Sequence, residues 1–343
     1  MPSSSPHPSR GLSERAIGIG AAAITVLIWT SFILIARASA DPSRGGTLSP
    51  FDIAFCRIVG AAVILLPWGA WLVRRDRARG IGQASLFGFA PLPLHVTLRV
   101  GLFGGFLYAV LAYQGFAFAP AAHASVLMPG SLPLWTTVLA LALLGERISA
   151  ARALALGLIV AGALLVGGAS LLRAFDGGQV WKGDALFMLA AFCWSTYSVL
   201  ARRYRLDAVR ATIAVTAFAF AAYVPLYTLA LATQLVPGRL LAAPLTEVIF
   251  QATYQGWGSV VISGITFTRM IGYFGPVRST MITALVPGLS ALGAVLLLGE
   301  PLGWNLLAGL ALVTLGILFG VHAGARSALK SKAPHARSTT AGA

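Results

Sequence analysis

The chain has 343 residues, of which 57% are hydrophobic and only 10% are charged, and its mean hydropathy is +0.82. Soluble domains carry about a quarter charged residues, so this composition excludes a soluble globular protein and indicates an integral membrane protein. The formal net charge of +15 would suggest a nucleic-acid partner in a soluble chain, but in a membrane protein basic residues also set the orientation in the bilayer.

The first 15 residues are rich in Ser and Pro and predict a disordered tail. Windows of about 20 residues, the length that crosses a bilayer as a helix, then predict ten transmembrane spans. The basic segment 323–343 predicts a second disordered tail. The ten predicted spans lie at residues 16–37, 51–74, 97–118, 122–144, 151–172, 184–202, 209–233, 250–274, 277–298 and 302–322.

The positions of Lys and Arg predict the orientation of these spans. Counted over alternate loops and tails, eighteen basic residues fall on one side and five on the other. Because basic residues concentrate on the cytoplasmic side of membrane proteins, both termini are expected in the cytoplasm. This asymmetry explains the net charge without any nucleic acid.

Two segments of the chain repeat the same pattern. "LPLWTTVLALALLGE" at 132–146 and "VPGLSALGAVLLLGE" at 286–300 each place a proline thirteen residues before a glutamate. "WTSFILIAR" at 29–37 similarly resembles "WSTYSVLAR" at 194–202. Five predicted spans separate the members of each pair. The pattern predicts two five-helix repeats, 16–172 and 184–322, and the odd number of crossings inverts the second repeat in the membrane.

The prolines and glutamates of the repeated pattern are candidates for function. Transporters with inverted repeats bind substrate near the midplane, at helices interrupted at matched positions, which points to Pro133 and Pro287. The alternative is that these prolines only kink packed helices. Glu146 and Glu300 each follow a glycine that can end a helix. They are interpreted as caps at the start of the next span, with a gating contact as the alternative.

The order of these motifs resembles the drug/metabolite transporter superfamily, and within it the EamA-type proteins with two five-helix repeats. The resemblance rests on the paired "Pro…LLGE" segments, on Trp29 and Trp194 with the Ser/Thr and aromatic residues after them, on "AFCRIVGAAVILLP", and on "GPVRSTMITALVPGLSALGAVLLLGEPL". It implies an all-helical inner-membrane exporter or exchanger of small metabolites, with a central cavity lined mainly by spans 1, 3, 4, 6, 8 and 9. It implies no particular substrate.

Charged residues inside the spans narrow the expected substrate. Small four-helix members of the superfamily couple proton entry to cation export through a glutamate in their first helix, and span 16–37 has none. Arg57 and Arg269, in contrast, lie inside predicted spans. An arginine that faces a cavity would favour a carboxylate or phosphate, whereas one that snorkels would reach an interface. We therefore expect a neutral, zwitterionic or anionic metabolite such as an amino acid.

Aromatic and polar side chains complete the predicted cavity, although a tryptophan in a helical bundle also serves in packing or as an interface anchor. Trp135, two residues after Pro133, is the first choice for a cavity wall. His123 lies at the outer start of the fourth span. It has either a solvated or packing role or, as the alternative, a role in a proton relay. The further candidates for the cavity are Trp29, Trp194, Tyr113, Gln114, Tyr197 and Trp257.

Other classes of function find little support in the sequence. No lysine stands in a GxxxxGK phosphate-binding loop, so an ATP-driven pump is not expected. No nucleophile motif accompanies the histidines, so the chain is predicted not to be an enzyme and to need no cofactor or metal. The expected partners are a small-molecule substrate and the lipid bilayer, and the oligomeric state stays open. A drug or organic-cation efflux protein, an intramembrane enzyme and a structural protein are the alternatives.

Overall fold

The computed structural model describes residues 14–81, 85–145, 148–283 and 285–332. Within these residues every regular element is helical and no strand is present, as the sequence predicts. The longer helices are α1 (Glu14–Ala40), α2 (Pro50–Ala78), α7 (Ala150–Leu172), α8 (Val180–Arg203), α9 (Ala208–Ala232), α11 (Ser263–Thr283), α12 (Leu285–Leu298) and α13 (Trp304–Lys332).

Two predicted spans change their helical geometry along their length. In one, α3 (Leu94–Gly101) continues through η3 (Leu102–Leu107) into α4 (Tyr108–Phe118). In the other, α10 (Leu245–Gln251) continues through η5 (Ala252–Ile262) into α11. Both η3 and η5 are π-helical, a rare geometry that is frequent at functional sites. They occupy the third span of each predicted repeat.

The fourth predicted span is broken close to its proline. α5 (Ala121–Leu127) ends before a turn at residues 128–131, which contains Pro129 and Gly130, and α6 (Leu132–Leu144) follows. Pro133 lies in the first turn of α6, just after this interruption, where the missing N–H of proline costs no internal hydrogen bond. Pro287 is the third residue of α12 as described, and because residue 284 lies outside the described residues, the interruption expected near Pro287 stays a prediction.

Some boundaries also differ from the predicted ones. α11 continues through residues 275–276, where a loop between two spans was expected, since membrane helices tolerate Gly and Pro. α13 extends to Lys332, because residues 323–332 are mostly good helix formers. Of the predicted tails 1–15 and 323–343, residues 1–13 and 333–343 lie outside the described residues, and residues 14–15 and 323–332 are helical. The loops hold the short helices η1 (Pro42–Arg44), η2 (Leu86–Gly88) and η4 (Arg173–Asp176).

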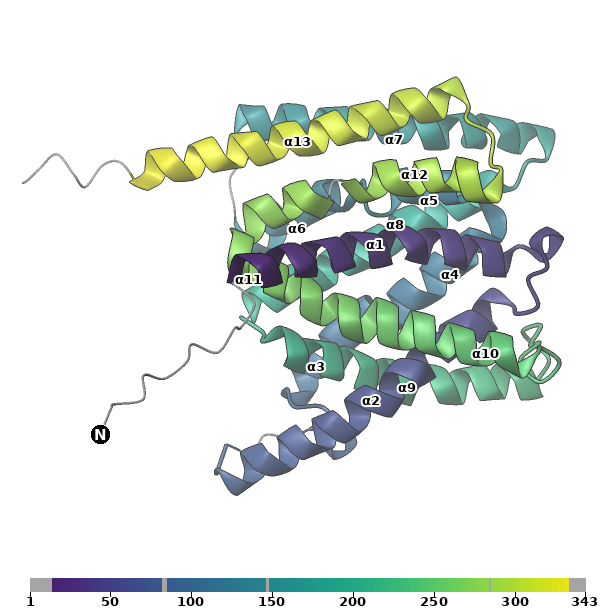
Figure 1. Cartoon of the computed structure of the whole chain (residues 1–343), viewed down its shortest axis with the longest axis vertical. Helices are drawn as coiled ribbons and strands as arrows, with labels where there is room; N and C mark the ends of the chain where they lie inside the picture. Colours follow the sequence, from purple (N-terminus) through teal and green to yellow (C-terminus); the bar gives the residue numbers. More distant parts are fainter. Residues whose placement is uncertain (1–13, 82–84, 146–147, 284, 333–343) are drawn as a thin grey trace, which may run out of the picture.

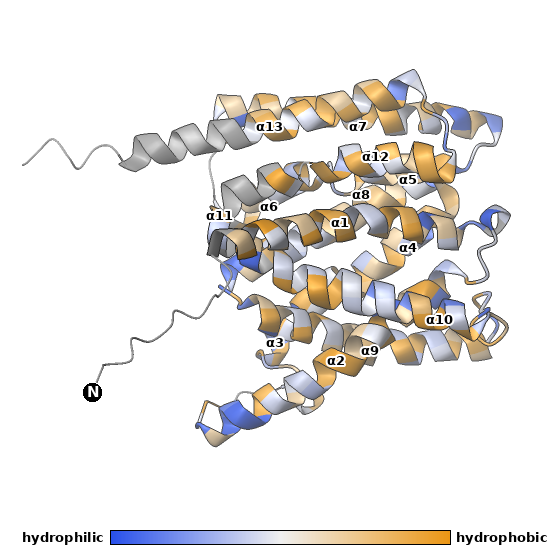
Figure 2. Ribbon diagram, viewed as in Figure 1, coloured by the Kyte–Doolittle hydropathy of each residue, from blue (hydrophilic) through white to orange (hydrophobic). Residues whose placement is uncertain are grey.

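The helices form one body with a lipid-compatible surface. Seven helices of the described chain are long and apolar enough to cross a membrane, and α12 and residues 304–320 form shorter apolar helices. Figure 2 shows apolar residues over the helix surfaces and hydrophilic residues gathered at helix ends. Leu27, Leu164 and Leu297 are between 65% and 75% exposed. A surface of this kind suits a multi-pass membrane protein.

The two ends of the body carry different residues. The start of α1 and the end of α13 lie at the same end in Figure 1. We call it the Asp76 end, because α2 finishes there close to Asp76. The opposite end contains the start of α2, the start of α5 and the segment between α12 and α13, and we call it the Glu300 end.

Helices from the two halves of the sequence pack against each other in matching pairs. α1 packs on α11 and α12, and α8 packs on α4 and α6. α2 packs on η5, and α9 packs on η3. α7 packs on α13, α5 on α12, and α2 on α9. Each of these contacts between the two halves thus has a counterpart in which the halves are exchanged.

The Gly-Glu ends of the repeated pattern have a defined backbone. Gly145 ends α6 with a φ of 66°, and Gly299 follows α12 with a φ of 61°, both in the left-handed region that favours glycine. The prediction that glycine ends both helices is confirmed.

Glu300 caps a helix, but a different one from the helix predicted. Its carboxylate accepts hydrogen bonds from the backbone N–H groups of Ala121 at 2.9 Å and Ala122 at 3.0 Å, at the start of α5. Arg37 Nε lies 3.5 Å from the same carboxylate. The loop after Gly299 brings Glu300 to α5 rather than to the following helix, α13, which starts only at Trp304. Glu146 lies outside the described residues.

Candidate functional site

A buried polar cluster surrounds Arg57 inside the helical body. The start of α2 is fixed by a capping box, in which Ser49 and Asp52 exchange hydrogen bonds between side chain and backbone. Arg57, about two turns further, is only 9% exposed. Its guanidinium donates a hydrogen bond of 2.8 Å to Ser259 Oγ on η5 and lies 5.5 Å from the centre of the Phe32 ring on α1.

Hydroxyl and amide groups extend this cluster. Tyr113 on α4 is 1% exposed and donates a hydrogen bond of 2.9 Å to Gln255 Oε1 on η5. Phe32, which lies beside Arg57, packs edge-on against Tyr113 with ring centres 6.1 Å apart. Side chains from α1, α2, α4 and η5 therefore meet at one cationic site.

The charge of Arg57 is not balanced by a carboxylate within the described chain. No Asp or Glu oxygen of the described residues forms an ion pair with it. Gln255 is fully buried, and its Nε2 has no hydrogen-bond partner among the described protein atoms. A buried cation and an unsatisfied N–H group are both costly in a medium of low polarity. An anionic group bound between them would remove both costs.

Close contact between α2 and η5 creates this arrangement. A Cβ on Gly60 would lie 2.0 Å from the carbonyl oxygen of Ala252, and a Cβ on Gly256 would lie 2.5 Å from the backbone nitrogen of Ala61. Such distances exclude any side chain larger than hydrogen at both glycines. The two backbones can therefore approach closely enough for the side chains of η5 to reach Arg57.

Several predicted cavity residues lie around this site. Tyr108, five residues before Tyr113 on α4, packs on Trp194 with ring centres 4.9 Å apart. Trp194 in turn packs on Tyr197 at 5.2 Å. Trp29 packs on Phe267 at 5.1 Å. Tyr108 thus extends the cluster from Tyr113 along α4 to Trp194 and Tyr197.

Other candidates from the sequence have different surroundings. Trp135 packs edge-on against Phe192 at 5.4 Å, and its buried Nε1 has no hydrogen-bond partner among the described protein atoms. Trp257 is 42% exposed and donates a hydrogen bond of 2.9 Å to the Gly60 carbonyl, which ties η5 to α2. Arg269 is exposed and Gln114 is half-buried.

Four residues of the cluster were not among the predicted cavity residues. They are Phe32, Tyr108, Gln255 and Ser259. Gln255 could have been selected as a polar residue inside a span, but nothing in the sequence distinguishes Ser259 from the other serines of the spans. Only the π-helical geometry of η5 and its contact with α2 place Ser259 beside Arg57.

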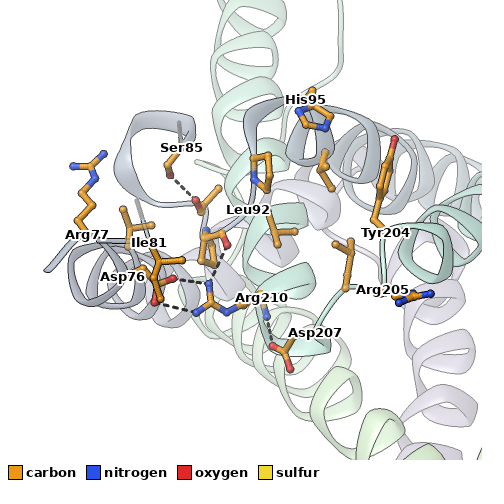
Figure 3. A pocket seen from close by; sticks show the side chains of 16 residues that line it. Asp76, Arg77, Ile81, Ser85, Leu92, His95, Tyr204, Arg205, Asp207 and Arg210 are labelled. Carbon is orange, nitrogen blue, oxygen red and sulfur yellow. Dashed lines mark hydrogen bonds and ion pairs between the residues drawn. The ribbon is translucent and has the colours of Figure 1, made fainter. Parts of the chain in front are cut away.

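A separate cavity of about 550 Å³ opens at the Asp76 end, as Figure 3 shows. Arg210 on α9 forms two ion-pair contacts with Asp76 on α2, of 2.6 and 3.1 Å, and donates to the Pro91 carbonyl. Asp76 lies 19 residues after Arg57 on the same helix, which corresponds to roughly 28 Å. Because the charge of Arg210 is already paired, this cavity is a poorer site for an anion than the surroundings of Arg57.

Comparisons with known proteins agree with the helical architecture. The model of the EamA-like transporter family matches residues 16–168 and again residues 181–321. A protein of Archaeoglobus fulgidus described as an uncharacterized transporter is 29% identical over 203 residues, which cover 58% of this chain and 61% of that protein. One solved crystal structure of a protein has 24% sequence identity to this chain. The match covers 92% of this chain and 98% of the other chain, with a TM-score of 0.52, and shows similarity of fold alone.

Proposed function

Because the chain belongs to the EamA-like transporter family, we propose that it is a secondary transporter that exports or exchanges a small metabolite across the inner membrane by alternating access. The proposed substrate carries a carboxylate or a similar anionic group, as an amino acid or a related zwitterionic or anionic compound does. The proposed binding site is the cluster around Arg57.

The proposed topology has ten transmembrane helices in two inverted repeats, 16–172 and 184–322, with both termini in the cytoplasm. The unequal distribution of basic residues, eighteen against five, supports this orientation. The common location of the start of α1 and the end of α13 supports an even number of crossings. The exchanged helix pairs support two similar halves. In this topology the Asp76 end faces the cytoplasm and the Glu300 end faces outward.

The observation that carries the substrate class is the unbalanced charge of Arg57. Its guanidinium is buried, has a neutral hydroxyl as its hydrogen-bond partner and lies against an aromatic ring. A planar guanidinium matches a carboxylate in two parallel hydrogen bonds, so Arg57 is suited to bind a carboxylate. Tyr113 and Gln255 supply further polar groups to orient the ligand.

Export of organic cations receives less support, because the buried carboxylates already have partners. Asp52 accepts hydrogen bonds from the backbone N–H groups of Ser49 and Arg239, at 2.8 and 2.9 Å. Glu300 is bound to the start of α5, and Asp184 accepts hydrogen bonds from neighbouring side chains. A cation would have to displace these contacts.

An intramembrane hydrolase is also disfavoured by geometry. His123, Asp184 and Ser170 do lie together, but Asp184 stands between the other two residues. In a catalytic triad the histidine stands between the serine and the carboxylate, so that it can take the hydroxyl proton. Ser170 here donates its proton toward the carboxylate and is not activated.

The proposal is tested by transport measurements on the purified full-length chain. A comparison of metabolites released by cells with and without the protein first identifies the transported compound. Its flux is then measured in proteoliposomes for the parent, for Arg57→Gln and for Arg269→Gln. The last variant removes the same charge at an exposed position.

Arg57→Gln should slow transport by about one to two orders of magnitude, since a hydrogen bond to a charged group contributes roughly 1.5–3 kcal/mol. Arg269→Gln should stay within about twofold of the parent. Transport at the parental rate by a correctly inserted Arg57→Gln protein would refute the anionic contact. Identification of the compound as an organic cation would refute the substrate class.

A further inference from the structure

A second polar cluster lies at the Glu300 end, distinct from the Arg57 site. His123 on α5 places its Nδ1 2.9 Å from Oδ1 of Asp184 on α8. The other carboxylate oxygen of Asp184 accepts a hydrogen bond from Ser170 on α7. Asp184 is 5% exposed, whereas the side chain of His123 is 16% exposed. The buried carboxylate of Asp184 therefore links α5, α7 and α8. Its histidine partner on α5 is partly accessible to water.

The body is closed around this cluster. Ala119, Ala121, Ala122 and Ala124, which surround the start of α5, are at most 1% exposed. Glu300 holds the first N–H groups of α5, and Asp184 holds His123 two residues later. α5 is also the first part of the broken fourth span, so it can move without the whole span. A movement of α5 would open the Glu300 end.

We propose that His123 and Asp184 form a proton-binding pair, and that one bound proton keeps the Glu300 end of the transport pathway closed. This inference rests on the proposed function in one respect, because it takes the pathway to open alternately at the two ends. Nothing in it depends on the identity of the metabolite.

The sign of the effect follows from the charges. Without an added proton, the neutral imidazole faces a buried carboxylate, and the pair carries one negative charge in a poorly polar environment. A proton on His123 makes the pair neutral overall and turns its contact into an ion pair between a charged donor and a charged acceptor. If opening separates α5 from α8, this gain is lost. Low pH should therefore favour the closed end and high pH the open end.

The neighbouring charged groups do not supply such a response near neutral pH. On α1 and just after it, Arg37 pairs with Glu300 and with Asp41. Lys182 on α8 lies over the Phe118 ring, and Arg173 after α7 is exposed. Carboxylates, lysines and arginines ordinarily keep their charge between pH 6 and pH 8, whereas imidazole titrates there.

The experiment measures the opening of the Glu300 end directly, without a transported compound. Cys56 and Cys193, both buried, are replaced by alanine in the full-length chain, and Ser125→Cys introduces one thiol on α5. Ser125 is fully buried, so a membrane-impermeant thiol reagent reaches position 125 only when the end opens. The same cysteine-free protein with Thr47→Cys, at an exposed position, is the reference. Its labelling rate gives the effect of pH on the reaction of a thiol that is always accessible.

The labelling rate at position 125, divided by the rate at position 47, should rise about five- to tenfold from pH 6 to pH 8, because the closed end binds one proton more than the open end. His123→Gln and Asp184→Asn should remove this dependence. His123→Lys, which keeps a positive charge at both pH values, should label slowly at both. His95→Gln, at an exposed histidine of the Asp76 end, should behave as the parent.

An equal labelling ratio at both pH values in the parent would overturn the proposal, and so would the full pH dependence in His123→Gln. A misfolded chain would expose position 125 and label rapidly at any pH, which would also remove the pH dependence. The His123→Lys variant controls for this outcome, because slow labelling at position 125 with normal labelling at position 47 requires a folded chain. Failure of the Arg57 transport test leaves these labelling results unaffected. Failure of the labelling test likewise leaves the substrate class untouched.

Discussion

Replacing Glu300 with glutamine tests whether the contact between the second half of the chain and α5 stabilises the fold. The carboxylate accepts one backbone hydrogen bond on each oxygen, and it is 5% exposed. Glutamine has one acceptor oxygen, and its NH₂ group would face the second N–H group, donor against donor. One buried N–H group then loses its partner, at a cost of roughly 1–3 kcal/mol.

The remaining hydrogen bond also loses its charge assistance, which adds about 1 kcal/mol. Arg37 contributes little to the total, because it keeps the ion pair with Asp41 and the hydrogen bond to the Phe116 carbonyl. We therefore expect Glu300→Gln to lower the free energy of unfolding by about 2–4 kcal/mol. For a chain of 343 residues that corresponds to a decrease in Tm of roughly 3–6 °C.

Thermal unfolding of the detergent-solubilised protein, followed by circular dichroism at one fixed scan rate, measures this decrease. Glu247→Gln is the matched control. Glu247 is half-buried and accepts one hydrogen bond of 2.8 Å, from Gln251, which glutamine at this position can still accept. Its Tm should fall by less than about 1 °C. Equal decreases for the two variants would show that the contact between Glu300 and α5 contributes no more than a surface hydrogen bond.

The glycines provide further predictions, each measured by the same thermal unfolding. Gly145→Ala and Gly299→Ala should each cost about 1–2 kcal/mol through their left-handed backbone alone, since no atom obstructs a Cβ at either position. Gly20→Ala, in open space on α1, should be neutral or stabilising, and a loss there equal to the other two would contradict the backbone explanation. Gly60→Ala should cost about 1–3 kcal/mol or more by forcing α2 from η5, and it should also slow transport. An unchanged Tm and transport rate for Gly60→Ala would show that the close contact is not needed.

The positions of the helices could be predicted because a bilayer requires apolar segments of about 20 residues. Local chemistry also identified the helix ends at Gly145 and Gly299, since these depend on the backbone of the residues themselves. The interruption of the fourth span lies just before Pro133 rather than at it, because a proline suits the first turn of a helix as well as a kink, and hydropathy does not separate the two.

Partnerships between distant residues could not be predicted. Tyr113 and Gln255 are 142 positions apart, and His123 and Asp184 are 61 positions apart. Glu300 was expected at the helix that follows it, because sequence reasoning assigns a cap to its own neighbour. In the folded chain Glu300 instead accepts hydrogen bonds from the first N–H groups of α5. Only the packing of the helices determines this partner.

The π-helical segments affect how the length of this chain can vary. A π turn holds one residue more than an α-helix needs for the same hydrogen-bonded closure, so deletion of one residue within η5 could be absorbed by a return to α-helix. The loops at both ends would stay in place. Each residue turns an α-helix by about 100°, so the part of the span before the deletion would rotate relative to the part after it. Gln255 and Ser259 would then no longer both keep their partners, Tyr113 on α4 and Arg57 on α2. Insertion and deletion, and not only substitution, therefore offer a route to a different set of side chains around Arg57.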